Sequence, residues 1–164
     1  MKKFKAGMKR IPEDIVHFFR EQGFVIVSTL DDRGRPHNSC KGIINISPSG
    51  KVYLLDVYLK NTYSNLKRNS NVSITAVDEH KFKGYCLKGK ANIINREQIN
   101  PQIRKEWDGR IAGRITQRLI KNIREQKGHP KHPEALLPHP EYMIVMEVSE
   151  IVDLTPHNLK GEVQ

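Results

Sequence analysis

Five short segments of strand-forming residues lie between residues 24 and 94, and turn residues separate them. Side chains that favour a pleated sheet are concentrated in residues 24–30, 35–47, 51–58, 72–77 and 85–94. Asp31–Gly34 and Pro48–Gly50 carry the residue types of tight turns. Strands this short and this closely spaced predict a small antiparallel barrel or sandwich. Gly89, inside the fifth strand, predicts a bulge or a close backbone approach.

Helical patterns flank these strands. A first helix is expected between Pro12 and Gly23, which are residues that start and stop helices. In residues 97–127 an apolar residue recurs every fourth position, which predicts either one helix or two helices broken near Gly109. The proline-rich residues 128–140 predict an irregular connection, and residues 142–154 predict a sixth strand.

Length and composition predict one domain, spanning residues 1–164, with a basic helical insertion at about 97–140. No apolar run approaches the roughly 20 residues of a membrane span, so we expect no membrane segment. Two cysteines without metal-site spacing suggest reduced thiols in a cytoplasmic protein. The net charge of +10 suits a nucleic acid, but it equally suits a phosphorylated cofactor and anionic substrates.

The segment Lys51–Asn69 combines a strand with a short helix, expected over Tyr63–Arg68 with Thr62 or Asn61 as its cap. Lys60, Asn61 and Thr62 would then lie where free backbone N–H groups and the helix dipole attract an anion. This arrangement is either an ordinary capped turn or a phosphate site.

The segment Ser39–Gly42 (Ser-Cys-Lys-Gly) lies in the middle of the neighbouring predicted strand. Small and polar side chains there leave a shallow surface on which a flat molecule can approach the backbone. A flat ring on this surface, with its phosphate at the helix that follows Lys60, describes bound flavin mononucleotide (FMN).

Other chemistries have weaker support. Three histidines of the proline-rich connection, His129, His132 and His139, match no standard metal-ligand spacing, so no metal site is predicted. Cys40 is expected to be an ordinary buried thiol because no base can be named for it. Nucleic-acid binding is disfavoured because Trp107 is the sole aromatic residue of the basic segment, whose charged face is better explained as solvated or as flanking a dimer.

The ordered set of motifs resembles the FMN-binding split-barrel family, the pyridoxamine 5′-phosphate oxidase-like proteins. The segments that carry this resemblance are FVIVSTLDDRGRPH (Phe24–His37), NSCKG (Asn38–Gly42), VYLLDVYLKNTYSNLKRNSNVSITAV (Val52–Val77) and GYCLKGKANI (Gly84–Ile93). The resemblance covers roughly residues 11–95 and the last strand, and the insertion at 97–140 departs from the family's minimal core. The arginine-rich FMN signature and the C-terminal substrate segment of the oxidases proper are not found.

This resemblance implies a mainly β fold, a six-stranded, Greek-key-like antiparallel split β-barrel with flanking α-helices. It also implies a homodimer with FMN at the interface. Ser39, Cys40, Lys41 and Gly42 should line the flavin ring, Val57 and Tyr58 should continue that wall, and Lys60, Asn61, Thr62 and Asn65 should hold the phosphate. We further expect Lys41 or nearby N–H groups to tune the ring and Trp107 of one subunit to cover the partner's flavin.

The expected activity is that of an FMN-dependent oxidoreductase acting on a small-molecule redox substrate, with no catalytic side chain named. Two alternatives stay open at this point. The first is a reductase that uses the deazaflavin F420 on the same fold. The second is a non-enzymatic FMN carrier or redox sensor.

Overall fold

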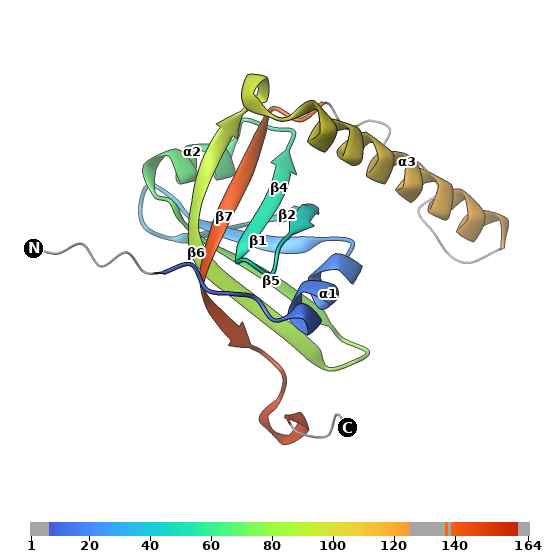
Figure 1. The fold of residues 1–164 in the computed structure, drawn as a ribbon, viewed down its shortest axis with the longest axis horizontal. Coiled ribbons are helices and arrows are strands. Elements are labelled where there is room, and N and C mark those ends of the chain that lie inside the picture. Colours follow the sequence, from blue (N-terminus) through green and yellow to red (C-terminus); the bar gives the residue numbers. More distant parts are fainter. Residues whose placement is uncertain (1–6, 125–136, 138, 161–164) are drawn as a thin grey trace, which may run out of the picture.

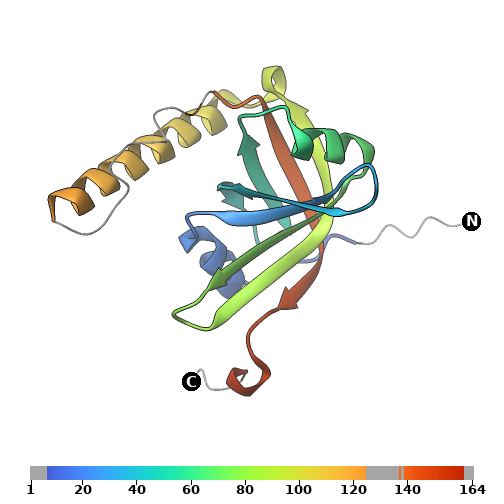
Figure 2. The same cartoon turned by 180° about the vertical axis from the view of Figure 1, so that it is seen from behind.

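The computed structural model describes residues 7–124, 137 and 139–160 (Figures 1 and 2). The helices are α1 (Glu13–Glu21), α2 (Asn61–Arg68) and α3 (Pro101–Ile123), with short 3-10 helices at Arg96–Gln98 and His157–Leu159. The strands are β1 (Val25–Leu30), β2 (Pro36–Lys41), β3 (Ile43–Ile46), β4 (Lys51–Asp56), β5 (Asn71–Asp78), β6 (Lys83–Asn95) and β7 (Tyr142–Asp153). None of the described helices is both long enough and apolar enough to cross a membrane.

All seven strands form one antiparallel sheet in the order β2-β1-β5-β6-β7-β4-β3. The strands β2 and β3 lie at opposite edges of this sheet, yet only Gly42 separates them in the sequence. Because consecutive Cα atoms are about 3.8 Å apart, the two edges must meet at Gly42. The sheet therefore curls into the predicted split barrel, as the ribbon in Figure 1 shows.

The predicted count of six strands is wrong, because the segment expected as one strand over residues 35–47 forms two. Its first half pairs with β1, from Pro36 opposite Leu30 to Lys41 opposite Val25. Its second half pairs with β4, beginning with Ile43 opposite Leu54. The chain changes partner at Gly42, where it crosses from one edge of the sheet to the other.

The barrel interior is filled by apolar side chains from every strand except β2, and from α1 and α2. The amphipathic pattern of α1 buries Ile15, Val16, Phe18 and Phe19, the apolar side expected from the sequence. The Phe18 ring meets the Tyr85 ring of β6 edge to face, with centroids 5.1 Å apart. Such burial, at about 25 cal/mol per Å² of apolar surface, is the main stabilising term of the fold.

The expected irregularity at Gly89 is confirmed. The register between β6 and β7 shifts between Lys88 and Gly89. A Cβ atom at Gly89 would lie 1.9 Å from the Glu147 carbonyl oxygen, so no other residue fits without a backbone shift. This bulge lets the long β6 bend as it passes from β5 to β7.

Residues Pro101–Ile123 form one continuous helix, α3, so Gly109 does not break it. The Asn100 side chain caps it by accepting a hydrogen bond from the Gln102 N–H at 2.8 Å. Near its beginning, Ile103 and Trp107 pack against a small apolar cluster of Ile44, Leu55, Ile99 and Met143. The far end of α3 points away from the sheet (Figures 1 and 2), where Ile123 is 80% exposed.

A buried polar network lies where the barrel edges meet. The Lys41 ammonium of β2 donates to Oδ2 of Asp56, the last residue of β4, and both side chains are 8% exposed. The Tyr142 hydroxyl, fully buried at the start of β7, donates to the same oxygen at 2.5 Å. The other oxygen of Asp56 accepts the backbone N–H groups of Val57 at 2.8 Å and Tyr58 at 3.3 Å. Asp56 therefore joins β2, β4 and β7 and fixes the turn that follows β4.

Burial, reinforced by the hydrogen bond to Asp56 and by its negative charge, raises the pKa of Tyr142 far above its ordinary value near 10. Tyr142 consequently stays protonated and acts as a donor. The ring of Tyr63, in α2, packs against it edge to face at 5.0 Å, so α2 is anchored to the same network.

Replacing Asp56 by alanine should lower the free energy of unfolding by about 3–5 kcal/mol, because Lys41 would remain buried without its counter-charge. The double replacement of Lys41 by methionine and Asp56 by leucine should lower the free energy of unfolding by less than Asp56→Ala does, because it leaves no buried charge without a partner. Urea denaturation measures both changes. Glu150→Ala, which breaks the exposed pair with Lys88, is the control and should cost less than about 1 kcal/mol. An Asp56→Ala variant as stable as the Glu150→Ala variant would contradict the role given to the network.

Candidate functional site

A cavity of about 290 Å³ lies between β2, the end of β4 and the first half of α3. It brings together seven of the predicted site residues. These are Ser39, Cys40, Lys41, Gly42, Val57, Tyr58 and Trp107. The first four come from β2 and the link to β3, whereas Val57 and Tyr58 follow β4 and Trp107 lies on α3. Trp107 was expected to cover a partner's site, and the structure places it at the cavity of its own chain.

Of the remaining predicted residues, Lys60 and Thr62 lie beside this cavity, at the beginning of α2, whereas Asn61 and Asn65 line a second cavity. The Thr62 hydroxyl is 3.1 Å from the Ser39 hydroxyl of β2, so the start of α2 touches the wall of the cavity. Lys60 is exposed, and its ammonium lies 5.3 Å from the centre of the Tyr58 ring. The start of α2 therefore borders the cavity.

The first turn of α2 has no side-chain cap. The helix begins at Asn61, two residues before the predicted start, so the expectation that Asn61 or Thr62 caps it is wrong. Lys60 occupies the capping position and makes no side-chain hydrogen bond to the helix. A lysine cannot accept a hydrogen bond from the N–H groups of a first helical turn, so no side chain of the cap satisfies them.

Asn65 is buried, and its amide is engaged within the protein. It donates to the Thr29 hydroxyl at 3.0 Å and accepts from the Arg68 guanidinium at 2.9 Å. Together with Asn61 it lines a second, polar cavity of about 630 Å³ at the β1–β2 turn. There the pKa of Asp31 lies below its ordinary value, chiefly because the Arg35 backbone N–H donates to it. Asn65 therefore holds α2 against β1 and lines the second cavity rather than the first.

Sequence reasoning missed two arginines and one aromatic residue of the first cavity. The Arg110 guanidinium donates to the carbonyl oxygens of Ile43 at 2.5 Å and Ile44 at 2.6 Å. The Arg114 guanidinium donates to the Gly23 carbonyl and stacks 4.7 Å from the centre of the Phe24 ring. The four-residue spacing of these arginines, which starts three residues after Trp107, places all three side chains on one face of a helix, but it does not show which strand edge that face meets.

The two cysteines carry no visible catalytic arrangement. Cys40 is exposed rather than buried as expected, and it lines the first cavity. Cys86 is half-buried in β6. No group of three or more potential metal ligands occurs in the described part of the chain. His129 and His132 lie outside the described residues, and His139 is exposed.

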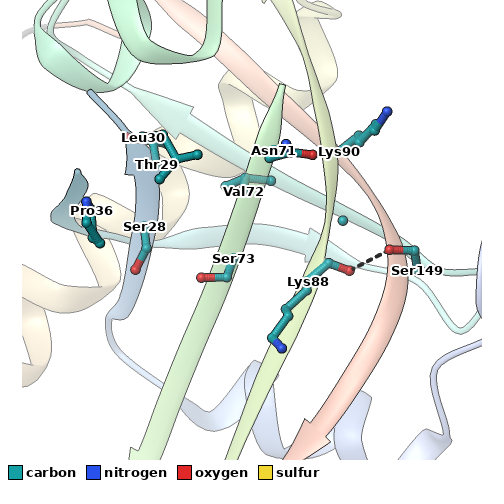
Figure 3. Close-up of a pocket in the computed structure, with 11 residues that line it drawn as sticks. Ser28, Thr29, Leu30, Pro36, Asn71, Val72, Ser73, Lys88, Lys90 and Ser149 are labelled. Carbon is teal, nitrogen blue, oxygen red and sulfur yellow. Dashed lines mark hydrogen bonds between the residues drawn. The ribbon is translucent and has the colours of Figure 1, made fainter. Parts of the chain in front are cut away.

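A third hollow, a groove of about 440 Å³, runs across the outer face of β1, β5 and β6 (Figure 3). It contains none of the predicted site residues. Its hydroxyl and amine groups are spread along the strands in Figure 3, and some of them already make hydrogen bonds or ion pairs within the protein. Ser149 donates to the Lys88 carbonyl at 3.3 Å, and the Lys88 ammonium pairs with Glu150 at 3.1 Å. Convergent polar groups are found instead at the cavity beside α2 and α3.

The fold matches several solved structures at low sequence identity. HupZ from group A Streptococcus is 18% identical, with 88% of this chain and 94% of that chain covered and a TM-score of 0.65. A Lactobacillus delbrueckii protein proposed to be a pyridoxamine 5′-phosphate oxidase is 17% identical, with 93% and 99% covered and a TM-score of 0.58. A pyridoxinephosphate oxidase family protein of Clostridium acetobutylicum, related to general stress protein 26, is 14% identical, with 87% and 95% covered and a TM-score of 0.52.

No curated protein matches the chain. The similarity to the solved structures supports the split-barrel fold, and a sequence comparison extends it to the family. Residues 11–137 match the family model described as pyridoxamine 5′-phosphate oxidase. This match includes strands β1 to β6, the helix α2 and the arginines of α3, and it ends before β7. The chain therefore belongs to the pyridoxamine 5′-phosphate oxidase family.

Proposed function

We propose that this protein is a flavoprotein oxidoreductase that binds FMN, with the flavin ring in the cavity between β2, β4 and α3. The observation that carries the proposal is the junction of this cavity with the uncapped first turn of α2, through the hydroxyls of Ser39 and Thr62, 3.1 Å apart. A molecule with a flat ring at one end and a phosphate at the other matches a cavity joined to a helix N-terminus.

The ring end of the site combines flat contact surface with a few polar groups. Trp107 and Tyr58 supply aromatic surface. Gly42 leaves room for the Arg114 guanidinium at the link between β2 and β3. Lys41 is fixed by Asp56 beside the cavity, so its position is set before a ligand arrives. A bound flavin would supply the redox chemistry, while these residues would orient it and set its electrostatic surroundings. The cavity of about 290 Å³ lies near the lower end of the range for small-molecule sites, which suits the ring alone.

The phosphate end of the site would lie at the beginning of α2. The backbone N–H groups of its first turn, the dipole of the helix and the exposed Lys60 ammonium all favour a dianion at this place. Thr62 would add a hydroxyl, and Asn61 an amide. Asn65 would act indirectly, because its own amide is used to hold α2 against Thr29.

Wild-type protein should bind FMN, and binding should quench the fluorescence of Trp107, the chain's single tryptophan. Replacing Lys60 by alanine should weaken binding roughly tenfold, because a charge-assisted contact to the phosphate is lost. The double variant with Thr62→Ala should bind more weakly still. A fluorescence titration with FMN measures these affinities.

Lys67→Ala is the matched control, because it removes the same charge from the last turn of the same helix. It should leave the affinity for FMN within about twofold of the wild-type value. Wild-type protein that ignores FMN would contradict the cofactor assignment. Equal losses in the Lys60 and Lys67 variants would contradict the position of the phosphate.

We also propose that two copies of the chain form a dimer through one end of the sheet. Five large apolar side chains gather there and are 44–63% exposed. They are Phe24, Ile26, Val77, Phe82 and Leu154. Val77 lies opposite Gly84 in β6, and the Leu154 N–H donates to the Gly84 carbonyl at 2.9 Å, so these two are neighbours. The Phe82 backbone has a φ of 49°, an uncommon conformation for an aromatic residue. An exposed apolar surface of this kind marks an interface, and Phe24 also borders the flavin cavity.

Light scattering should therefore give twice the chain mass of 18.9 kDa. Val77→Lys should shift the protein toward the monomer, because it would place a charge in the apolar contact. Leu119→Lys, on the exposed part of α3, is the control and should remain dimeric. A monomeric wild type, or equal dissociation of both variants, would rule out this interface.

A role as a carrier or sensor of FMN is the alternative to catalysis on the same site. Both roles need the cofactor, but only an enzyme sustains turnover. Steady consumption of NAD(P)H or another electron donor by the FMN-loaded protein would identify an enzyme.

We further propose that the whole chain, residues 1–164, forms a single FMN-binding domain. Limited proteolysis tests this, because a second domain would be released as a stable fragment.

A further inference from the structure

The apolar ridge of α3 turns away from the barrel toward the end of the helix. Ile111 and Ile115 are half-buried, whereas Leu119 is 45% and Ile123 80% exposed. A step of four residues turns about 40° beyond one full helical turn, so a ridge with this spacing winds around the helix. Ile120, which is 44% exposed, adds a third large side chain. The tip of α3, residues 119–124, therefore presents an aliphatic face to solvent.

Basic residues flank this aliphatic face. Between Gly109 and Arg124 the sequence has five basic residues and no aspartate or glutamate. Two of them belong to the tip: Lys121 lies in the last turn of α3, and Arg124 follows the helix directly. Both are exposed, and neither forms an ion pair with another residue of the part of the chain that the structure describes. Since they are three residues apart, they lie on the same side of the helix.

The tip of α3 projects from the body of the protein in both views of the fold (Figures 1 and 2). A projecting helix end can lie on a flat surface without a groove to receive it. Helices that bind at the interface of an anionic lipid bilayer combine aliphatic side chains with adjacent basic residues. The aliphatic groups enter the boundary between headgroups and acyl chains, while the cations meet the negative charge of the headgroups. The tip carries both kinds of residue side by side.

A nucleic acid would explain these residues less well. Phosphate groups would use the cations, but they would gain nothing from an exposed leucine and two exposed isoleucines. The tip also has no aromatic side chain on which a base could stack. The aliphatic face therefore favours a lipid surface over another polyanion.

We propose that the tip of α3 binds the surface of membranes that contain anionic lipids. Leu119, Ile120 and Ile123 enter the bilayer interface, and Lys121 and Arg124 contact the lipid headgroups. The helix lies on the surface, since no described helix is long and apolar enough to cross a membrane. Binding does not depend on the flavin, because the tip shares no residue with the lining of the candidate cavity.

Flotation of the full-length protein with lipid vesicles tests this proposal. The wild type should bind vesicles of phosphatidylcholine mixed with phosphatidylserine roughly tenfold or more tightly than vesicles of pure phosphatidylcholine. Lys121→Gln and Arg124→Gln should each weaken this binding roughly fivefold, the contribution of one basic residue near an anionic bilayer. Ile123→Ser should weaken it roughly tenfold, because less apolar surface enters the interface.

Lys67→Ala is the control, because it removes an exposed charge from the end of α2, on the other side of the barrel from the tip (Figures 1 and 2). It should change vesicle binding by less than about twofold, since attraction to the bilayer falls off within a Debye length. An equal loss in this variant would mean that the whole basic surface binds, and it would overturn the proposal.

Ile123→Ser keeps the charge of the protein, so it separates insertion of aliphatic groups from attraction between charges alone. If this variant binds anionic vesicles as tightly as the wild type does, charge alone explains the binding and the proposal fails. It also fails if the wild type ignores anionic vesicles, or binds pure phosphatidylcholine equally well. Binding to duplex DNA without binding to vesicles would identify a nucleic acid as the partner instead. Conversion of a dimer to a monomer by Ile123→Ser, measured by light scattering, would assign the aliphatic face to a second copy of the chain and would likewise overturn the proposal.

Discussion

The buried pair of Lys41 and Asp56 is the contact on which the rest of the structure depends. It joins the last residue of β2 to the last residue of β4 where the two edges of the sheet meet. Tyr142 and the backbone after β4 complete the hydrogen bonding of Asp56, so the buried charges are compensated. Closing the barrel at this point creates the cavity wall, and the same carboxylate sets the turn that leads to α2. The same network of hydrogen bonds therefore stabilises the fold and sets the geometry of the candidate site.

Much of the fold could be predicted from the sequence, because short alternating strands and turn residues report directly on a curled antiparallel sheet. The bulge at Gly89 was also predictable, since a glycine within a strand signals a close approach. The division of the second strand was not, because Gly42 interrupts neither the strand-forming composition nor the alternation strongly enough to show a change of partner. That change is a tertiary event, and it raises the strand count from six to seven.

The candidate site was predictable in part. Ser39–Gly42, Val57, Tyr58 and Trp107 meet at one cavity. Arg110 and Arg114 could not be assigned, because the sequence shows a basic helix without showing which strand edge its arginines face. Their carbonyl partners lie 66 or more residues away in the chain. The helix α3, which lies within the residues that match the family model, is consequently a wall of the cavity.

The identity of the small molecule that stays bound through purification under native conditions tests the central claim most directly. Denaturing the purified protein and analysing the released ligand by absorbance and mass spectrometry should identify FMN in near-equal amount to the chain. Release of the deazaflavin F420 would leave the fold assignment unchanged and would show that the cofactor is F420 rather than FMN. Release of a ligand without a flavin-type ring, or failure of ligand-free protein to take up FMN, would contradict the account.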